Sequence, residues 1–307
     1  MKFGVHLPLI DFGDGLLARR ELRDYTATAA DLGYATLSAN DHLVWQRPWL
    51  DGPTTLTSLH ADAGDMALAT SVSLPAVRHP SVLAKWLTTL GCLTDNRIIA
   101  GLGPGSSSAD YAAVGVPFED RWARFDEALR VAKALIRGEP VPPGAFYDLE
   151  GICLAPLPST PPEVWFGSWG SDRRLRAMAQ IADGWMASGY NTTPEGFAQA
   201  RERLDGHLIA GGRDPAAFPD LIATMWLYIT DDRDEANRAL QGILGGILRR
   251  DPRELAAQLP IGPAGHCIDL LNSYAQAGAR QILLWPIRNP AHQLRLFHEM
   301  IAPNVGG

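Results

Sequence analysis

Three short segments carry residue types that could take part in chemistry, and each follows a strand-like apolar run. Asp41-His42 offers a carboxylate and an imidazole, the side chain best suited to moving a proton near neutral pH. The segment 101–108 joins glycines, which let the backbone approach a ligand closely, to three serine hydroxyls. The segment 167–171 is also glycine-rich, and it precedes a predicted helix N-terminus that favours anions. These segments predict proton transfer at His42 and two loops that bind a phosphate-bearing ligand.

Each segment also has a purely structural explanation, which the sequence leaves open. Gly103-Pro104-Gly105 can simply make a turn, and Ser171 can simply cap a helix. A lone histidine is often a hydrogen-bonded structural residue. His6 is the other candidate for proton transfer. It projects from the first strand, so it is expected to pack against its neighbours rather than to transfer a proton.

Tryptophans gather near the ends of the predicted strands more than a random core would place them. Some of them are expected in the core, but an aromatic-lined opening is what a planar cofactor or an apolar substrate needs. The tryptophans concerned are Trp45, Trp49, Trp165, Trp169, Trp185, Trp226 and Trp285.

Other catalytic machinery is missing from the sequence. There is no Gly-x-Ser-x-Gly nucleophile motif, no Walker phosphate loop and no His-Glu-x-x-His pair. Cys92, Cys153 and Cys267 are far apart without metal-ligand spacing, so we expect buried reduced thiols and no metal site. A bound organic cofactor is therefore expected to supply the reactive chemistry.

Eight strand-then-helix units must position these segments. Parallel strands alternating with helices predict the α/β class, and eight units in 307 residues match a closed (β/α)8 TIM barrel, whose usual size is about 250 residues. The surplus predicts an insertion after strand four, as loops or a short hairpin, and one after strand seven, as extra helix. The predicted strands are 3–7, 34–39, 66–74, 97–102, 163–167, 184–188, 221–230 and 281–286.

The competing architecture is an open doubly wound sheet. That fold would place a glycine fingerprint after the first strand, but the first strand here ends in His6-Leu7-Pro8. We therefore expect residues 1–307 to form a single barrel domain. In such a barrel the active site lies at the C-terminal ends of the strands, where the three segments fall.

Composition limits the partners of the chain. Lys and Arg number 27 against 34 Asp and Glu, a net charge of −7, and no cationic cluster offers a surface for nucleic acid or anionic lipid. The longest apolar runs fall short of the roughly 20 residues that a membrane-spanning helix needs. The N-terminal residues lack the apolar core of a secretory signal, so a cytoplasmic protein is expected.

With these motifs in order, the chain resembles the luciferase-like monooxygenase superfamily, flavin and deazaflavin enzymes built on a (β/α)8 barrel. Each motif is short, but their order and spacing together are specific. The segment 90–97 is most similar to the branch that uses the deazaflavin coenzyme F420. The matching motifs are Asn40-Asp41-His42-Leu43, Ala69-Thr70-Ser71-Val72, Arg78-His79-Pro80, Gly101-Leu102-Gly103-Pro104-Gly105, Gly115-Val116-Pro117-Phe118, Ala182-Asp183-Gly184-Trp185 and Gly262-Pro263-Ala264.

The resemblance implies that the tricyclic ring of F420, or of FMN in the alternative, lies in the open end of the barrel against the third strand. Ser71-Val72 matches a non-proline cis peptide that bulges against the ring, and His42 matches a histidine that handles the proton beside the hydride-carrying carbon. The implied cofactor-binding residues are Asp41, Ser71, Val72, Gly103, Gly105, Ser106, Gly167, Gly170 and Ser171.

One position departs from the resembled branch. Its sugar-phosphate dehydrogenases carry an acid where this chain has Ser106, which argues against carbohydrate oxidation. We therefore expect F420-dependent hydride transfer to or from a small, fairly apolar organic substrate, in a homodimer. An FMN-dependent monooxygenase that uses oxygen and a non-catalytic cofactor-binding barrel are the alternatives.

Overall fold

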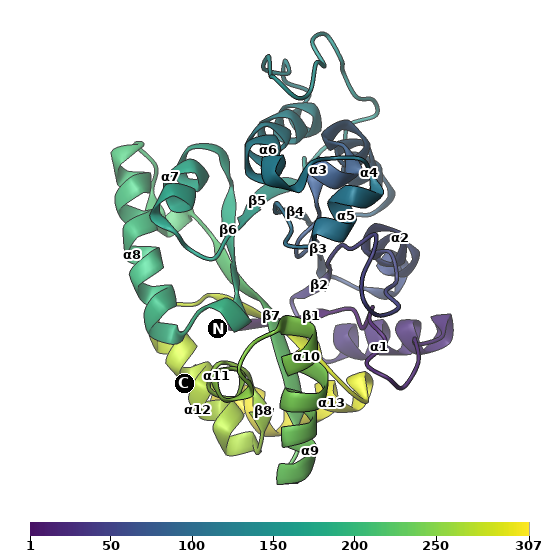
Figure 1. Ribbon diagram of the computed structural model, residues 1–307, viewed down its shortest axis with the longest axis vertical. Coiled ribbons are helices and arrows are strands. Elements are labelled where there is room, and N and C mark those ends of the chain that lie inside the picture. Colours follow the sequence, from purple (N-terminus) through teal and green to yellow (C-terminus); the bar gives the residue numbers. More distant parts are fainter. Residues whose placement is uncertain (307) are drawn as a thin grey trace.

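The centre of the molecule is a closed barrel of eight parallel strands surrounded by helices (Figure 1). The computed structural model describes residues 1–306. Strands β1 to β7 pair in chain order, and β9 pairs with both β7 and β1, which closes the cylinder. The predicted (β/α)8 barrel is confirmed. The barrel strands are β1 (Lys2–His6), β2 (Thr36–Ala39), β3 (Ala67–Thr70), β4 (Ile98–Leu102), β5 (Glu163–Gly167), β6 (Gly184–Ser188), β7 (Asp220–Ile229) and β9 (Gln281–Pro286).

The helices pack an apolar stripe against the outside of the barrel. In α6, the residues Phe125, Leu129, Ala132 and Ile136 are buried at helical spacing, and Gly138 ends the helix with a φ of 67°. The α-helices are α1 (Arg19–Asp31), α2 (Gly52–Leu59), α3 (Pro75–Arg78), α4 (Pro80–Leu93), α5 (Ser108–Ala113), α6 (Arg121–Arg137), α7 (Asp172–Ile181), α8 (Pro194–Ala210), α9 (Arg233–Asn237), α10 (Gly246–Leu248), α11 (Pro252–Gln258), α12 (Ala264–Gln276) and α13 (Pro290–Leu296).

The inside of the barrel holds its own buried cluster, made of alternate strand residues. Every second residue of a strand faces the inside of the barrel. The inward-facing residues that come after this cluster along each strand therefore lie nearer the C-terminal ends of the strands. We call these strand ends and the loops that follow them the mouth of the barrel. The cluster consists of Ala67, Ala69, Ile99, Trp165, Met186, Leu221, Ala223 and Leu283.

The two predicted insertions are present. Residues 139–162 run as loops without strands, and Glu127 accepts three backbone N–H groups of this segment. The second insertion forms α9, a π-helical segment (Arg238–Gly245), α10, α11 and the short strand β8 (Ile261–Gly262), as the prediction of extra helix required.

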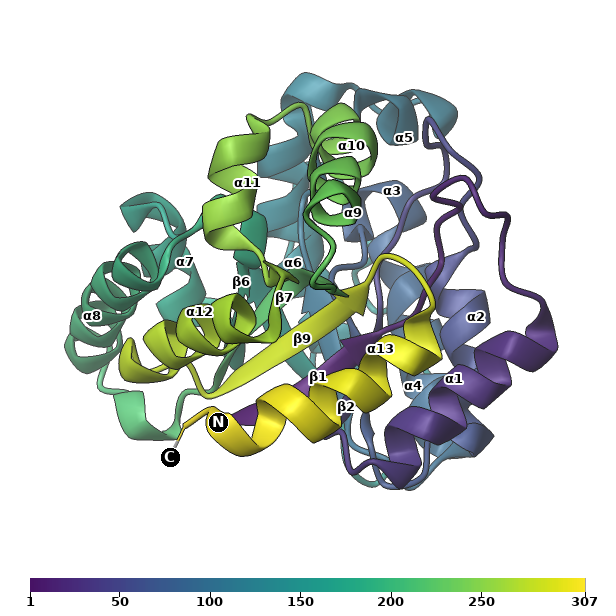
Figure 2. The same cartoon turned by 90° about the horizontal axis from the view of Figure 1, so that it is seen from below.

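The second insertion lies on the mouth side of the barrel, together with α5 (Figure 2). Gln46, in the loop after β2, donates to the backbone oxygen of Ile247 at 3.2 Å. Arg250 donates to the side-chain oxygen of Asn191, in the loop after β6, at 3.3 Å. The insertion therefore contacts loops from two separate parts of the mouth.

The third strand is shorter than predicted. It was expected over 66–74 but spans Ala67–Thr70, and the peptide bond between Ser71 and Val72 that follows it is cis. Pairing with β4 resumes at Ser73, whose N–H donates to the oxygen of Gly101 at 2.8 Å. The apolar pattern continued through this break, so periodicity could not reveal it.

The prediction of buried thiols was wrong for two of the three cysteines. Cys267 is buried, but Cys92, near the end of α4, and Cys153, in the first insertion, are exposed. Apolar neighbours in sequence do not bury a residue at a helix end or in a loop. Within residues 1–306, no helix is both long and apolar enough to span a membrane.

Candidate active site

His42 lies at the mouth with its ring held by a buried carboxylate. Its Nδ1 is 2.7 Å from Oδ2 of Asp110, a residue with no exposed surface at the start of α5. The other oxygen of Asp110 accepts the backbone N–H groups of Leu43 and Val44 at 2.8 and 2.9 Å. Asp110 therefore fixes the loop after β2 and orients the imidazole. The second ring nitrogen of His42 has no hydrogen bond to any residue that the structure describes.

Aromatic rings enclose His42 and continue into the barrel. The ring centroids of Trp45 and Trp49 lie 4.1 and 4.6 Å from that of His42. Trp49 meets Trp285 edge to face at 5.9 Å. We call Trp45, Trp49, Trp226 and Trp285 the tryptophan cluster.

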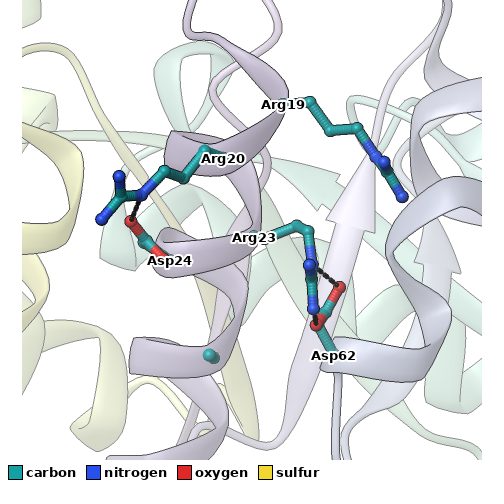
Figure 3. Close-up of a pocket in the computed structure, with 6 residues that line it drawn as sticks. Arg19, Arg20, Arg23, Asp24 and Asp62 are labelled. Atoms are coloured by element: carbon teal, nitrogen blue, oxygen red, sulfur yellow. Dashed lines mark hydrogen bonds and ion pairs between the residues drawn. The ribbon is translucent and has the colours of Figure 1, made fainter.

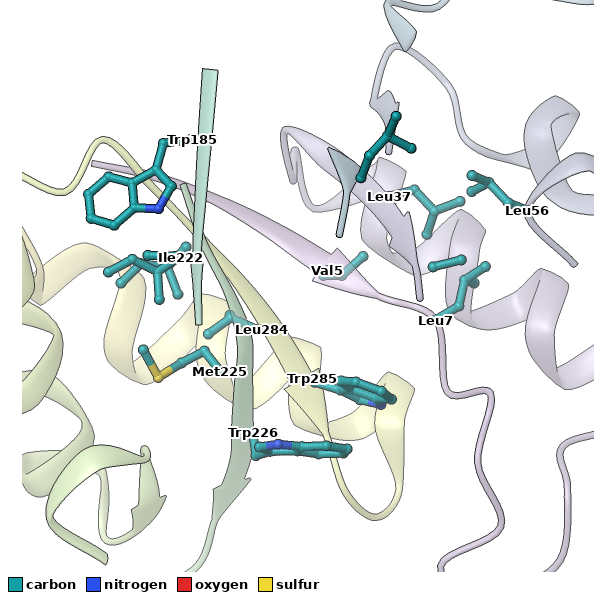
Figure 4. Close-up of a cluster of buried hydrophobic side chains, with 14 of the residues drawn as sticks. Val5, Leu7, Leu37, Leu56, Trp185, Ile222, Met225, Trp226, Leu284 and Trp285 are labelled. Carbon is teal, nitrogen blue, oxygen red and sulfur yellow. The ribbon is translucent and has the colours of Figure 1, made fainter. Parts of the chain in front are cut away.

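The inner part of the tryptophan cluster is a stack across three neighbouring strands. Trp226 of β7 and Trp285 of β9 are register partners, and their rings lie parallel at 3.9 Å (Figure 4). His6 of β1 stacks on Trp285 at 3.5 Å. Burial lowers the pKa of His6 to about 3, so its imidazole is neutral. This histidine packs, as its position in the first strand predicted.

Asp41 forms an ion pair with Arg78. Its carboxylate receives two hydrogen bonds from Arg78, at 2.7 and 2.6 Å, and its side chain is 1% exposed. Arg78 also pairs with Asp51, the N-cap of α2. This ion pair joins the loops after β2 and β3. A hydrogen bond from Asp41 to a cofactor stays a prediction.

The segment after β3 fits against two predicted glycines. The cis peptide expected at Ser71-Val72 is present. A Cβ atom added to Gly103 or to Gly167 would lie 2.6 Å from a methyl group of Val72. Because any larger residue at either position would collide with Val72, Gly103 just after β4 and Gly167 at the end of β5 allow the half-buried Val72 to lie across the ends of both strands.

The rest of the glycine loop after β4 lies further out. Gly105 has a φ of 73° and a Cβ there would lie 3.0 Å from Leu74, so both conformation and space favour glycine. Ser106 is exposed.

The loop after β5 turns into the N-terminus of α7. Gly170 has a φ of 87°, and its N–H donates to the hydroxyl of Ser168 at 3.2 Å. Ser171 is the N-cap residue, as predicted, but its side chain caps no N–H of the helix. The N–H groups of this helix terminus therefore remain available to an anion. Arg174 points elsewhere, to Asp126 at 2.6 Å.

Several buried polar atoms at the mouth have no partner among the described residues. The hydroxyl groups of Ser71 and Ser73 are enclosed without a hydrogen bond, on either side of Val72. Buried hydroxyls are normally satisfied, so these two mark a surface made for a ligand or for bound water. Together with the glycines under Val72 and the uncapped helix, they fit a flat cofactor with a phosphate-bearing tail.

Sequence reasoning missed two residues of this arrangement, Asp110 and Arg78. Both lie in the first helix after a strand-end loop, one after β4 and one after β3. An acid or base at that place in a barrel faces the mouth or its rim, and this signal could have found them. Residues 1–306 contain no group of three or more His, Cys, Asp or Glu side chains placed to hold a metal.

Surface depressions elsewhere carry ordinary ion pairs. One lies against α1, where Arg23 pairs with Asp62 at 2.8 Å and Arg20 with Asp24 at 3.8 Å (Figure 3). These arginines are more than half exposed, so such pairs contribute little.

Comparison with known proteins agrees with this geometry. A family model described as luciferase-like monooxygenase matches residues 1–281. An F420-dependent glucose-6-phosphate dehydrogenase of Beutenbergia cavernae is 31% identical over 234 residues, which cover 73% of this chain and 68% of the relative.

Two solved structures share the fold over nearly the whole length. An F420-dependent secondary alcohol dehydrogenase in complex with an F420-acetone adduct has a TM-score of 0.84 at 16% identity, covering 99% of this chain and 98% of the other. The oxygenating constituent of a diketocamphane monooxygenase from Pseudomonas putida, in complex with FMN, has a TM-score of 0.73 at 14% identity, with coverage of 99% and 98%.

Proposed function

The chain belongs to the luciferase-like monooxygenase family, and from that membership we propose that it is an F420-dependent oxidoreductase. The reaction is hydride exchange between F420 and a small, fairly apolar organic substrate. The observation that carries the proposal is the surface formed by Val72 over Gly103 and Gly167, next to the histidine on the neighbouring loop.

Deazaflavin, when bound, supplies a two-electron hydride carrier that reacts poorly with oxygen. Val72, which rests on Gly103 and Gly167, offers it a surface, and the unpartnered hydroxyl groups of Ser71 and Ser73 lie on either side of Val72 in the chain. Gly105, Ser106, Gly170 and Ser171 border the path that its ribityl and phosphate groups would take.

His42 handles the proton that accompanies the hydride. Asp110 accepts the Nδ1 proton, which leaves Nε2 to exchange a proton with the substrate oxygen. A neutral His42 takes the proton when an alcohol is oxidised, and a protonated His42 gives one when a carbonyl is reduced. The aromatic walls around the ring exclude water from this exchange.

The substrate differs from that named for the bacterial relative. The tryptophan cluster and the serine at position 106 favour an uncharged organic molecule over a sugar phosphate. We further propose that the protein acts in the cytoplasm as a homodimer, the default expectation for this fold.

Cofactor binding tests the proposal. Calorimetric titration with F420 and with FMN is expected to give tight, saturable binding of F420 and weaker binding of FMN. Gly167→Ala should weaken F420 binding, whereas Gly206→Ala, at an exposed position of α8 with open space around it, should leave F420 binding unchanged. Tight FMN binding without F420 binding would support an oxygen-using monooxygenase instead. If F420 binds but His42→Ala changes no turnover, a non-catalytic binding barrel is supported.

A further inference from the structure

We infer that the substrate is an uncharged, planar, conjugated ring compound that carries oxygen acceptors at its edge, such as a quinone or an aryl ketone. This inference rests on the proposed function, because it concerns the molecule that exchanges hydride at the same mouth. It narrows the substrate class from a small apolar molecule to a flat one.

The first observation is the position of the proton donor. His42 keeps 13% of its side chain exposed, and the half-buried rings of Trp45 and Trp49 lie against it. A substrate oxygen that reaches Nε2 must therefore bring the rest of the substrate alongside indole rings. Flat conjugated rings gain most from such contact, since aromatic pairs contribute beyond the area that they bury.

The second observation is that these two indoles are braced. Trp49 rests on Trp285, which is itself stacked between Trp226 and His6. Trp226 and Trp285 are 3% and 0% exposed, so the residues packed around their rings hold these rings in place. The tryptophan cluster is thus a rigid wall, which suits a rigid substrate better than a flexible chain.

The third observation is a set of unused hydrogen-bond donors. The indole N–H groups of all four members of the tryptophan cluster are enclosed and lack an acceptor within residues 1–306. A buried indole N–H usually finds a partner. The donors of Trp45 and Trp49, whose rings flank His42, call for oxygen acceptors on the ligand, and a plain hydrocarbon would leave them unpaired.

The fourth observation concerns charge. The rings in contact with one another are indoles, two histidines and the phenyl ring of Phe12, and His6 is kept neutral by burial. Nδ1 of His42 is hydrogen-bonded to Asp110. No lysine or arginine of residues 1–306 stacks on a ring of the tryptophan cluster, so an uncharged oxygen such as a carbonyl fits it better than a phosphate.

The reaction balances without a further reactant. With reduced F420 bound, the cofactor would supply a hydride for the carbonyl carbon or its conjugated position, and protonated His42 would give the proton to the oxygen. The substrate would thereby gain two electrons and two hydrogens, and the cofactor would be left oxidised by two electrons.

Calorimetry on the F420-loaded protein tests the inference, with menadione as the flat conjugated probe. Cyclohexanone serves as a non-aromatic ketone and glucose 6-phosphate as a charged control. We expect menadione to bind at least tenfold more tightly than either, and Trp49→Leu to weaken it about tenfold. Trp86→Leu, on α4 among the outer helices, should leave menadione binding unchanged.

A second variant separates ring contact from hydrogen bonding. Trp45→Phe keeps a ring but removes the N–H. It should weaken menadione binding by a smaller factor than Trp49→Leu does. Equal binding of cyclohexanone, tighter binding of glucose 6-phosphate, or menadione binding untouched by both variants would overturn the inference. Each of these results leaves F420-dependent hydride transfer standing if F420 still binds, but tighter binding of glucose 6-phosphate would also contradict the apolar substrate of the proposed function. Loss of F420 binding itself would reject the proposed function, and menadione binding to the cofactor-free protein would still decide the inference.

Discussion

Nδ1 of His42 lies 2.7 Å from Oδ2 of Asp110, although the two residues are 68 positions apart in the chain. The contact joins the loop after β2 to the helix after β4, across the end of β3 between them. The same carboxylate holds two backbone N–H groups of the His42 loop. One buried acid thus sets both the shape of the loop and the direction of the imidazole.

Replacement of His42 should slow hydride transfer without loss of cofactor. A positioned general acid or base contributes about 10²- to 10⁴-fold, so we expect His42→Gln to lower the single-turnover rate by roughly 100-fold or more. Stopped-flow oxidation of reduced F420 by a carbonyl probe measures the rate, and calorimetry measures F420 affinity. If His42→Gln instead lowers F420 affinity and keeps the hydride-transfer rate at saturating F420, His42 binds the cofactor and does not transfer the proton.

Asp110→Asn tests Asp110 as a positioning residue. The amide oxygen can still accept the loop N–H groups, but the charge beside the imidazole is gone. The amide nitrogen would face Nδ1 of His42 as a donor, so the imidazole would carry its proton on Nε2 and could not accept one there from an alcohol. We therefore expect Asp110→Asn to slow single-turnover alcohol oxidation, measured by stopped-flow reduction of F420, while calorimetry shows unchanged F420 affinity. A rate equal to that of the unaltered protein would contradict the positioning role of Asp110.

Because Val72 packs directly against Gly167, we expect Val72→Ala to restore part of the F420 affinity that Gly167→Ala loses. Gly167→Ala places a methyl group 2.6 Å from Val72, so Val72 must shift and F420 affinity should fall about tenfold or more. Adding Val72→Ala removes the collision and should restore part of the affinity, although Val72→Ala alone also loses contact with the cofactor. If the double variant binds F420 no better than Gly167→Ala alone, the collision is not the cause.

The ion pair of Arg78 with Asp41 is predicted to stabilise the fold. Arg78→Met leaves a carboxylate of 1% exposure without its partner, which costs about 3–5 kcal/mol in the free energy of unfolding. Guanidinium denaturation measures the loss, and Asp41→Asn in the same chain should recover part of it. Arg20→Met, which breaks an exposed pair with Asp24, is the control and should leave the stability unchanged.

His6 predicts a specific acid sensitivity. Burial lowers its pKa from 6.5 to about 3, so the unfolded chain takes up a proton below pH 6.5 while the folded chain does not. The free energy of unfolding should therefore fall as the pH drops from 6.5 toward 3, by at most about 1.4 kcal/mol per pH unit. His6→Gln should show a flatter dependence on pH, whereas His292→Gln, at an exposed position, should keep the full slope. Identical slopes in all three proteins would contradict the burial of a neutral imidazole.

The architecture could be predicted from the sequence because each strand is short, apolar and followed by a helical pattern. Periodicity placed β4, β5 and β6 within one or two residues of their ends. The resemblance added what periodicity could not, the cis peptide at Ser71-Val72. It also directed attention to the glycines on which Val72 rests.

A sequence signal could place Asp110 and Arg78 near the mouth, but which site residue each would pair with was beyond prediction. Nothing in local spacing tells that Asp110 will meet His42, or that Arg78 will occupy both oxygens of Asp41. Such contacts depend on how neighbouring loops close at the mouth. The same holds for the tryptophans, of which Trp169 is 68% exposed while Trp165 and Trp185 are buried in the core.

A crystal structure of the protein with bound F420 tests the central claim most directly. The account predicts the tricyclic ring at the mouth, with one face against the Ser71-Val72 peptide and its reactive carbon near Nε2 of His42. It also predicts the tail phosphate near Gly170 and Ser171. A ring bound outside the barrel, or one separated from His42 by the tryptophan cluster, would contradict it.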